Sequence, residues 1–85
     1  MRIDLRHIEC FIAVAEELHF RKAAARLHIS QPPLSFHIRN LENLIGVQLL
    51  NRTNRSVSLT SSGKFFLDKV RPAFDDLRAA IEMAS

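Results

Sequence analysis

The sequence has few residues of several types on which whole classes of protein depend. Cysteine occurs once, at Cys10, so an internal disulfide cannot form and a structural zinc would need ligands of other types. Two glycines and three prolines exclude a collagen-like or linker-dominated chain. No apolar run approaches the roughly 20 residues of a membrane span, and no leader pattern opens the chain. We therefore expect a cytoplasmic protein without a membrane partner, in which Cys10 is a buried apolar residue.

The 85 residues are enough for one small domain, and their charge is unevenly distributed. Apolar residues make up 47% and charged residues 25% of the chain, as in an ordinary globular protein. Between Leu18 and Leu67 there are seven basic residues and a single acid, Glu42, whereas the two ends together carry a net charge of −3. This distribution predicts a basic central surface that binds a polyanion.

The first half of the chain has the pattern of three helices. Asp4 is a good N-cap for a helix that ends near Leu18, and a shorter helix is expected over residues 21–27. Ser30 can cap a third helix whose first turn contains Pro32 and Pro33, with Gly46 just beyond its end. In this third helix an apolar stripe, consisting of Leu34, Ile38, Leu41 and Ile45, faces the core, and the opposite face carries Pro32, Phe36, Arg39 and Asn43.

The second half predicts a hairpin followed by a long helix. Residues 47–51 and 56–60 read as short strands, joined by a polar turn with Arg52 and Arg55 at its tip. In the last segment Pro72 either kinks one helix or begins a second one. An apolar seam for a second copy of the chain is expected there, made of Leu67, Val70, Phe74, Leu77 and Ile81.

The fold expected from these elements is mostly α with a short β-hairpin. It is a winged helix-turn-helix over residues 1–60, followed by a linker or dimerisation helix over residues 61–85. The motifs Ser30-Gln31-Pro32-Pro33-Leu34-Ser35, Leu49-Leu50-Asn51-Arg52 and Leu59-Thr60-Ser61-Ser62-Gly63 resemble the N-terminal DNA-binding domain of LysR-type transcriptional regulators. Phe36 stands where members of that family often have arginine or another polar residue, and Pro72 is not usual in their last helix.

The resemblance implies sequence-specific binding to a double-stranded DNA operator of dyad symmetry, as a homodimer joined by the last helix. It further implies that the full-length protein is a higher oligomer with a C-terminal domain for a small-molecule effector, which this fragment lacks, so no cofactor is expected here. The amide of Gln31 matches the major-groove edge of adenine, and a thymine methyl would cover Phe36. The expected DNA contacts are Arg21, Ser30, Gln31, Pro32, Ser35, Phe36, Arg39, Arg52 and Arg55.

Two other functions fit parts of the sequence. A metal-sensing winged-helix repressor would use His7 and Cys10, which are three residues apart, with His19 and His28 near the second helix. Two ligands at that spacing are too few for such a site, and no second cluster faces them. A helical protein-interaction module would explain the apolar seam and leave the basic centre without a purpose. Catalysis is not expected, because the chain has no glycine-rich phosphate loop and no nucleophile elbow.

Overall fold

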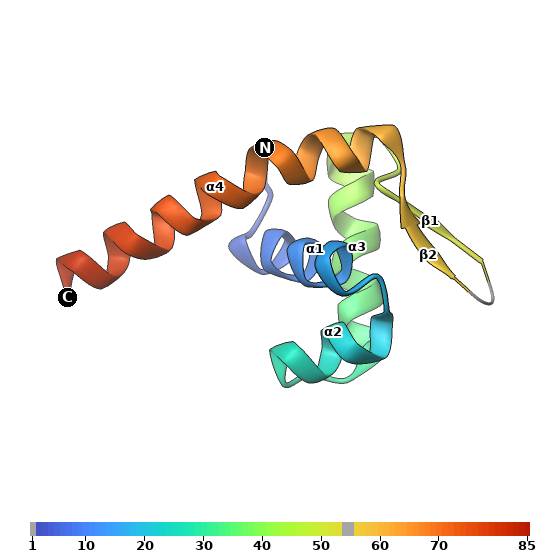
Figure 1. The fold of residues 1–85 in the computed structure, drawn as a ribbon, viewed down its shortest axis with the longest axis horizontal. Helices are drawn as coiled ribbons and strands as arrows, with labels where there is room; N and C mark the ends of the chain where they lie inside the picture. The colour runs from blue at the N-terminus through green and yellow to red at the C-terminus, as the bar shows by residue number, and fades with distance from the viewer. Residues whose placement is uncertain (1, 54–55) are drawn as a thin grey trace.

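The computed structural model describes residues 2–53 and 56–85, which form four helices and one hairpin. The order is α1 (Leu5–Glu17), α2 (Phe20–Leu27), α3 (Gln31–Ile45), β1 (Leu50–Arg52), β2 (Val57–Leu59) and α4 (Ser61–Ala84). The hairpin projects from one end of the molecule and the second half of α4 from the other (Figure 1). This arrangement confirms the predicted winged helix-turn-helix with a long C-terminal helix.

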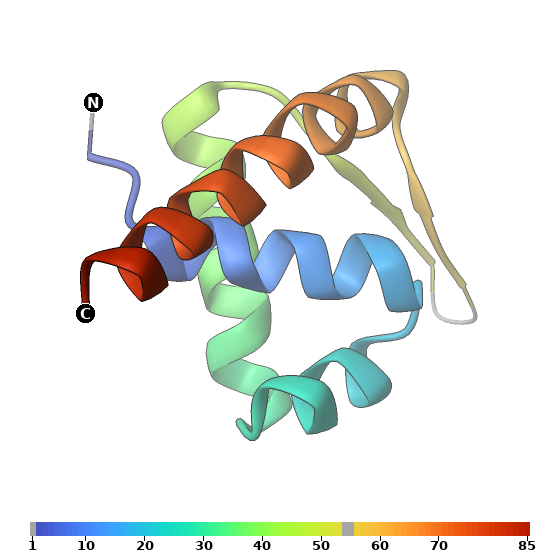
Figure 2. The ribbon, with the colours of Figure 1, turned by 60° about the vertical axis from the view of Figure 1, so that its left-hand side comes forward.

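The central helix of the fold is α1, which crosses α3 and is covered by α2 and α4 on other sides (Figure 2). Most of its residues are buried, including Phe11, Val14 and Cys10, whose thiol has a raised pKa because of that burial. The stripe on α3 is buried as predicted, with Leu34, Ile38 and Leu41 in the core and Ile45 at its edge. The hydrophobic core therefore fixes which face of α3 is left exposed.

The C-terminal end of α2 and the N-terminal end of α3 are formed by residues whose backbone is not helical. His28 ends α2 with a φ of 58°, the left-handed conformation that glycine usually supplies. Ser30 occupies the N-cap position of α3, but its side chain makes no capping hydrogen bond. Pro32 and Pro33 lack the N–H groups that an N-cap side chain normally binds, so the expected capping role of Ser30 is wrong.

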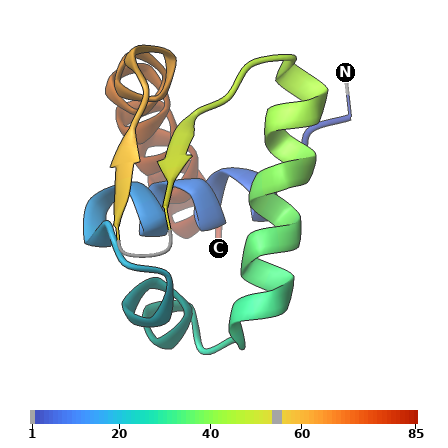
Figure 3. The same cartoon turned by 90° about the vertical axis from the view of Figure 1, so that its right-hand side faces the viewer.

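The hairpin is shorter than predicted, with antiparallel register Leu50–Leu59, Asn51–Ser58 and Arg52–Val57. The strands lie on the side of the molecule where α4 begins, apart from the ribbon of α3, and β2 leads directly into α4 (Figure 3). The side chain of Thr60 accepts from the Gly63 amide at 2.9 Å and donates to the Gln48 carbonyl at 2.7 Å. Thr60 thus caps α4 and ties the helix to the segment before β1.

Pro72 lies within one uninterrupted helix, so the alternative of a second helix starting there is wrong. The predicted seam is split by packing. Leu67, Val70 and Phe74 are partly buried against the molecule's own core, whereas Leu77 and Ile81 are 38% and 56% exposed. The division of the chain into a DNA-binding domain that ends at residue 60 and a linker helix that starts at residue 61 stays a prediction.

None of the helices in the described part of the chain is long and apolar enough to cross a membrane.

Candidate nucleic-acid interface

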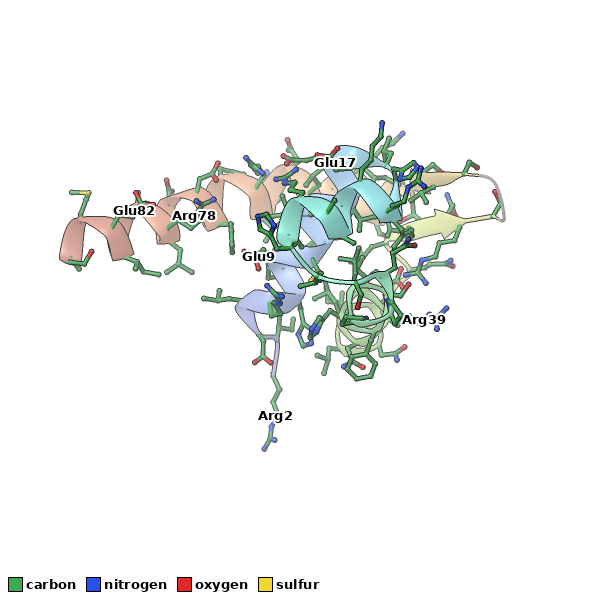
Figure 4. The ribbon with its side chains drawn as sticks, turned by 90° about the horizontal axis from the view of Figure 1, so that it is seen from below. Arg2, Glu9, Glu17, Arg39, Arg78 and Glu82 are labelled. Carbon is green, nitrogen blue, oxygen red and sulfur yellow. The ribbon has the colours of Figure 1, made fainter. Side chains whose placement is uncertain are left out.

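The exposed face of α3 carries no acidic side chain along the first two and a half turns of the helix. Gln31, Pro32 and Arg39 are exposed, Ser35 is half-buried, and the ring of Phe36 is 60% exposed. Arg39 projects outward from α3, on a different side of the molecule from Glu17 of α1 (Figure 4). This face can therefore approach a negatively charged groove without burying a carboxylate.

The predicted contacts outside α3 lie in several places. Arg21 is exposed in the first turn of α2, where the His19 side chain caps the helix by accepting from the Lys22 amide at 3.1 Å. Ser30 is exposed at the start of α3. Arg55 lies outside the described residues, so its predicted contact stays a prediction.

The placement of Arg52 corrects the sequence prediction. Arg52 ends β1 instead of standing at the tip of the turn, and its Nη2 donates to Glu42 Oε1 at 3.1 Å. Its guanidinium carbon lies 5.6 Å from the centre of the Phe20 ring, and its buried Nε has no hydrogen-bond partner. The guanidinium thus makes contacts within the domain, and the DNA contact expected of Arg52 stays a prediction.

A histidine pair lies at the contact between α1 and α3. The rings of His7 and His37 are 5.6 Å apart, and His7 Nδ1 accepts from the Asp4 amide at 3.0 Å. His37 Nδ1 is buried without a partner. Burial lowers the pKa of His37, and the charges of His7 and Arg6 lower it further. His37 therefore favours a neutral imidazole ring at this contact.

An ion-pair network joins three of the helices on the side of α4. Glu16 of α1 bonds Arg26 of α2 at 2.8 Å and Arg71 of α4 at 2.7 Å. Arg26 also reaches Glu17, and Arg71 reaches Asp75. The acids of α1 and α4 thus form ion pairs with bases away from the exposed face of α3. The sequence indicated the acidic ends of the chain but not these pairs.

The alternatives found in the sequence gain no support from this geometry. Within residues 2–53 and 56–85, no group of three or more histidine, cysteine, aspartate or glutamate side chains is arranged to hold a metal ion.

The contacts of Glu42 and Phe20 with Arg52 were not predicted from the sequence. The signal for Glu42 was available, because it is the single acid in the basic central stretch.

Residues 5–64 match the family described as bacterial regulatory helix-turn-helix protein, lysR family. The chain is 59% identical over 85 residues to the uncharacterized HTH-type transcriptional regulator YnfL of Escherichia coli (strain K12). It is 54% identical over 82 residues to the HTH-type transcriptional regulator AlsR of Bacillus subtilis (strain 168). Both matches cover 96% of this chain, which spans only 29% and 27% of those two regulators.

Solved structures agree in fold. The BenM_DBD/catB site 1 DNA complex has a TM-score of 0.89 and 43% identity, with 95% of this chain and 91% of that chain covered. The CbnR_DBD–DNA complex has a TM-score of 0.88 and 37% identity, with 95% and 93% covered. Oxidized Corynebacterium glutamicum OxyR matches with a TM-score of 0.94 and 35% identity, over 100% of this chain and 28% of that one. This chain therefore belongs to the LysR family of bacterial regulatory helix-turn-helix proteins.

Proposed function

We propose that this LysR-family domain binds a dyad-symmetric site in double-stranded DNA, with α3 in the major groove and the hairpin against the backbone or the adjacent minor groove. The observation that carries the proposal is the contrast between the two faces of α3. Its inner face is buried in the core, whereas its outer face exposes Gln31, Phe36 and Arg39. The major groove of B-DNA admits one helix, and residues near the start of that helix reach the base edges.

The side chains on the outer face of α3 favour a DNA site in which the contacted bases include an A·T pair. The Gln31 amide offers one donor and one acceptor, which is the pattern that pairs with N7 and N6 of adenine. The exposed ring of Phe36 is stabilised when an apolar group covers it, and the methyl of thymine is such a group in the major groove. Arg39 and Arg21 supply charge for phosphate oxygens, which fixes position on the duplex and not sequence.

The second half of α4 is proposed to join two copies of the chain. Leu77 and Ile81 are exposed beyond the region where α4 packs on its own core, and they line a groove of about 260 Å³ together with Leu5 of α1. A partner helix in this groove would cover the exposed apolar area. Leu67, Val70 and Phe74 then act mainly in the core of each copy, at the edge of the interface.

The proposed role is binding and not catalysis, and it needs no cofactor within these 85 residues. The relatives that the chain matches are named as transcriptional regulators. We infer the cytoplasm as the location, because the DNA of a bacterium lies there. A small-molecule effector and assembly beyond the dimer belong, in this proposal, to the effector domain that the resemblance implies for the full-length protein.

Selection of bound sites from random DNA, followed by titration at several salt concentrations, tests this proposal. We expect a dyad with half-sites that contain an A·T pair, and an affinity that falls steeply as salt rises, since bound phosphates release counterions. Binding without a salt slope, or an enriched site without dyad symmetry, would contradict the proposed mode.

A further inference from the structure

Glu42 is a carboxylate whose position is unusual for a surface that meets DNA. It is the single acid between Leu18 and Leu67, and it lies on α3, where a negative charge would repel phosphate. Its side chain is only 12% exposed. One oxygen, Oε2, accepts from the amides of Leu49 and Leu50 at 2.8 and 3.2 Å. The carboxylate is therefore held by the backbone at the start of the hairpin.

Arg52 extends this contact to α2. Its Nη2 donates to the other oxygen of Glu42, and its guanidinium lies over the ring of Phe20, the first residue of α2. The Arg52 side chain is 25% exposed, so both the ion pair and the cation–π contact are partly shielded from water. The three side chains, Glu42, Arg52 and Phe20, connect α3, β1 and α2 in one chain of contacts, which we name the hairpin clamp.

The hairpin needs such a support. Each strand has three residues, and a two-stranded hairpin of this size is marginal in water by itself. Thr60 ties the other side of the hairpin to α4, but it does not reach α3. Among the residues that the structure describes, the side-chain hydrogen bonds from α3 to the hairpin are those of Glu42.

We propose that Glu42 is a positioning residue for DNA binding, which acts through Arg52 and Phe20 to hold the hairpin at a fixed place relative to α3. This inference rests on the proposed function. A hairpin whose position is fixed before binding can contact DNA while α3 lies in the major groove. Because it is already ordered, it loses little conformational entropy when the DNA binds. The charge of Glu42 is neutralised by Arg52 and two amides, so it does not oppose the approach of phosphate.

Two DNA duplexes separate this role from a direct contact. The long duplex contains the selected half-site with its flanks, and the short duplex contains only the segment that α3 covers. We expect Glu42→Gln to weaken binding to the long duplex on the order of tenfold and to leave the short duplex unchanged within about twofold. Arg52→Gln should do the same, and the double variant should be no weaker than either single variant, since each single variant already breaks the Glu42–Arg52 ion pair.

Glu82→Gln is the matched control, because it removes the same charge from an exposed side chain near the end of α4. It should leave the long-to-short affinity ratio unchanged. If Glu42→Gln instead strengthens binding to both duplexes while Arg52→Gln weakens both, Arg52 contacts phosphate directly and the clamp is refuted. Should Glu42→Gln fail to fold by circular dichroism, Phe20→Leu tests the same ratio, since it keeps apolar bulk and removes only the aromatic face.

The outcomes for the clamp and for the proposed function are distinguishable. A parent chain that shows no salt-dependent affinity for the long duplex refutes the proposed function. A parent chain that binds, while Glu42→Gln and Phe20→Leu both keep its long-to-short ratio, refutes the clamp alone.

Discussion

At the scale of single residues, we expect His37 to make the stability of the domain depend on pH. His37 Nδ1 is buried without a partner beside His7, whose own Nδ1 already accepts from the Asp4 amide. The charges that face the pair are those of Arg6, which disfavours protonation of His37, and of Asp4, which favours it. Burial is the largest effect, and it lowers the pKa of His37.

We predict that the free energy of unfolding falls as the pH is lowered from about 7 to 5. The unfolded chain binds a proton near the ordinary histidine pKa of about 6.5, while the folded chain resists it. The contribution of His37 is therefore complete above that value and is lost as the pH falls toward the lower folded pKa. Urea titrations at several pH values measure this, and His37→Gln should flatten the dependence. His28→Asn, at an exposed position, is the control, and an equal flattening by both variants would contradict the assignment.

At the scale of elements, local sequence signals predicted more than long-range ones. The three N-terminal helices were predicted to within a residue or two, because caps, prolines and apolar spacing act locally. The left-handed conformation of His28 could not be predicted, since it depends on how α2 and α3 meet. The contact of Arg52 with Glu42 spans ten residues of sequence and was missed for the same reason.

The apolar seam of α4 shows most clearly that spacing along the sequence does not predict long-range packing. Spacing alone predicts that Leu67 and Ile81 share a helix face, but it does not say where the core beneath that face ends. The structure places that end between Phe74 and Leu77. Three of the five predicted dimer contacts, Leu67, Val70 and Phe74, are therefore core contacts.

The junction between the hairpin and α4 leads to a prediction about Gly63. A β-carbon there would overlap the Leu49 carbonyl and lie 3.2 Å from Leu59 Cδ2. Gly63→Ala should lower the free energy of unfolding by about 1–3 kcal/mol, as other overpacking substitutions do, although alanine ordinarily favours a helix. Urea denaturation measures the change, with Ser62→Ala at the exposed neighbouring position as the control. A stabilised Gly63→Ala variant would show that the backbone contact is not tight.

At the scale of the whole molecule, we predict a dimer held by the end of α4. Ile81→Asp should yield a folded monomer in sedimentation equilibrium, because a charge on an exposed face disrupts association without touching the core. Asp76→Asn, at an exposed position five residues earlier, should remain dimeric. A parent chain that stays monomeric at high micromolar concentration would refute the proposed interface.

The second half of α4 projects away from α3 in a molecule with extents of 43 × 26 × 21 Å (Figure 1), so the proposed interface lies apart from the exposed face of α3. We therefore expect that dimerisation and base reading can be disrupted separately. Ile81→Asp should retain weak binding to a single half-site, whereas changes on α3 should leave the dimer intact.

The outer face of α3 is proposed to read base edges, and a ratio of two affinities is the sharpest check of this role. This ratio compares the affinity for the selected site with that for random DNA, measured for the parent chain and for Gln31→Ala. We predict that Gln31→Ala costs about 1–3 kcal/mol on the selected site and much less on random DNA, so the ratio falls. Gln48→Ala, an exposed glutamine beyond α3, should leave it unchanged. If Gln31→Ala also leaves the ratio unchanged, α3 does not read the sequence through Gln31, and specificity has to come from the shape of the DNA.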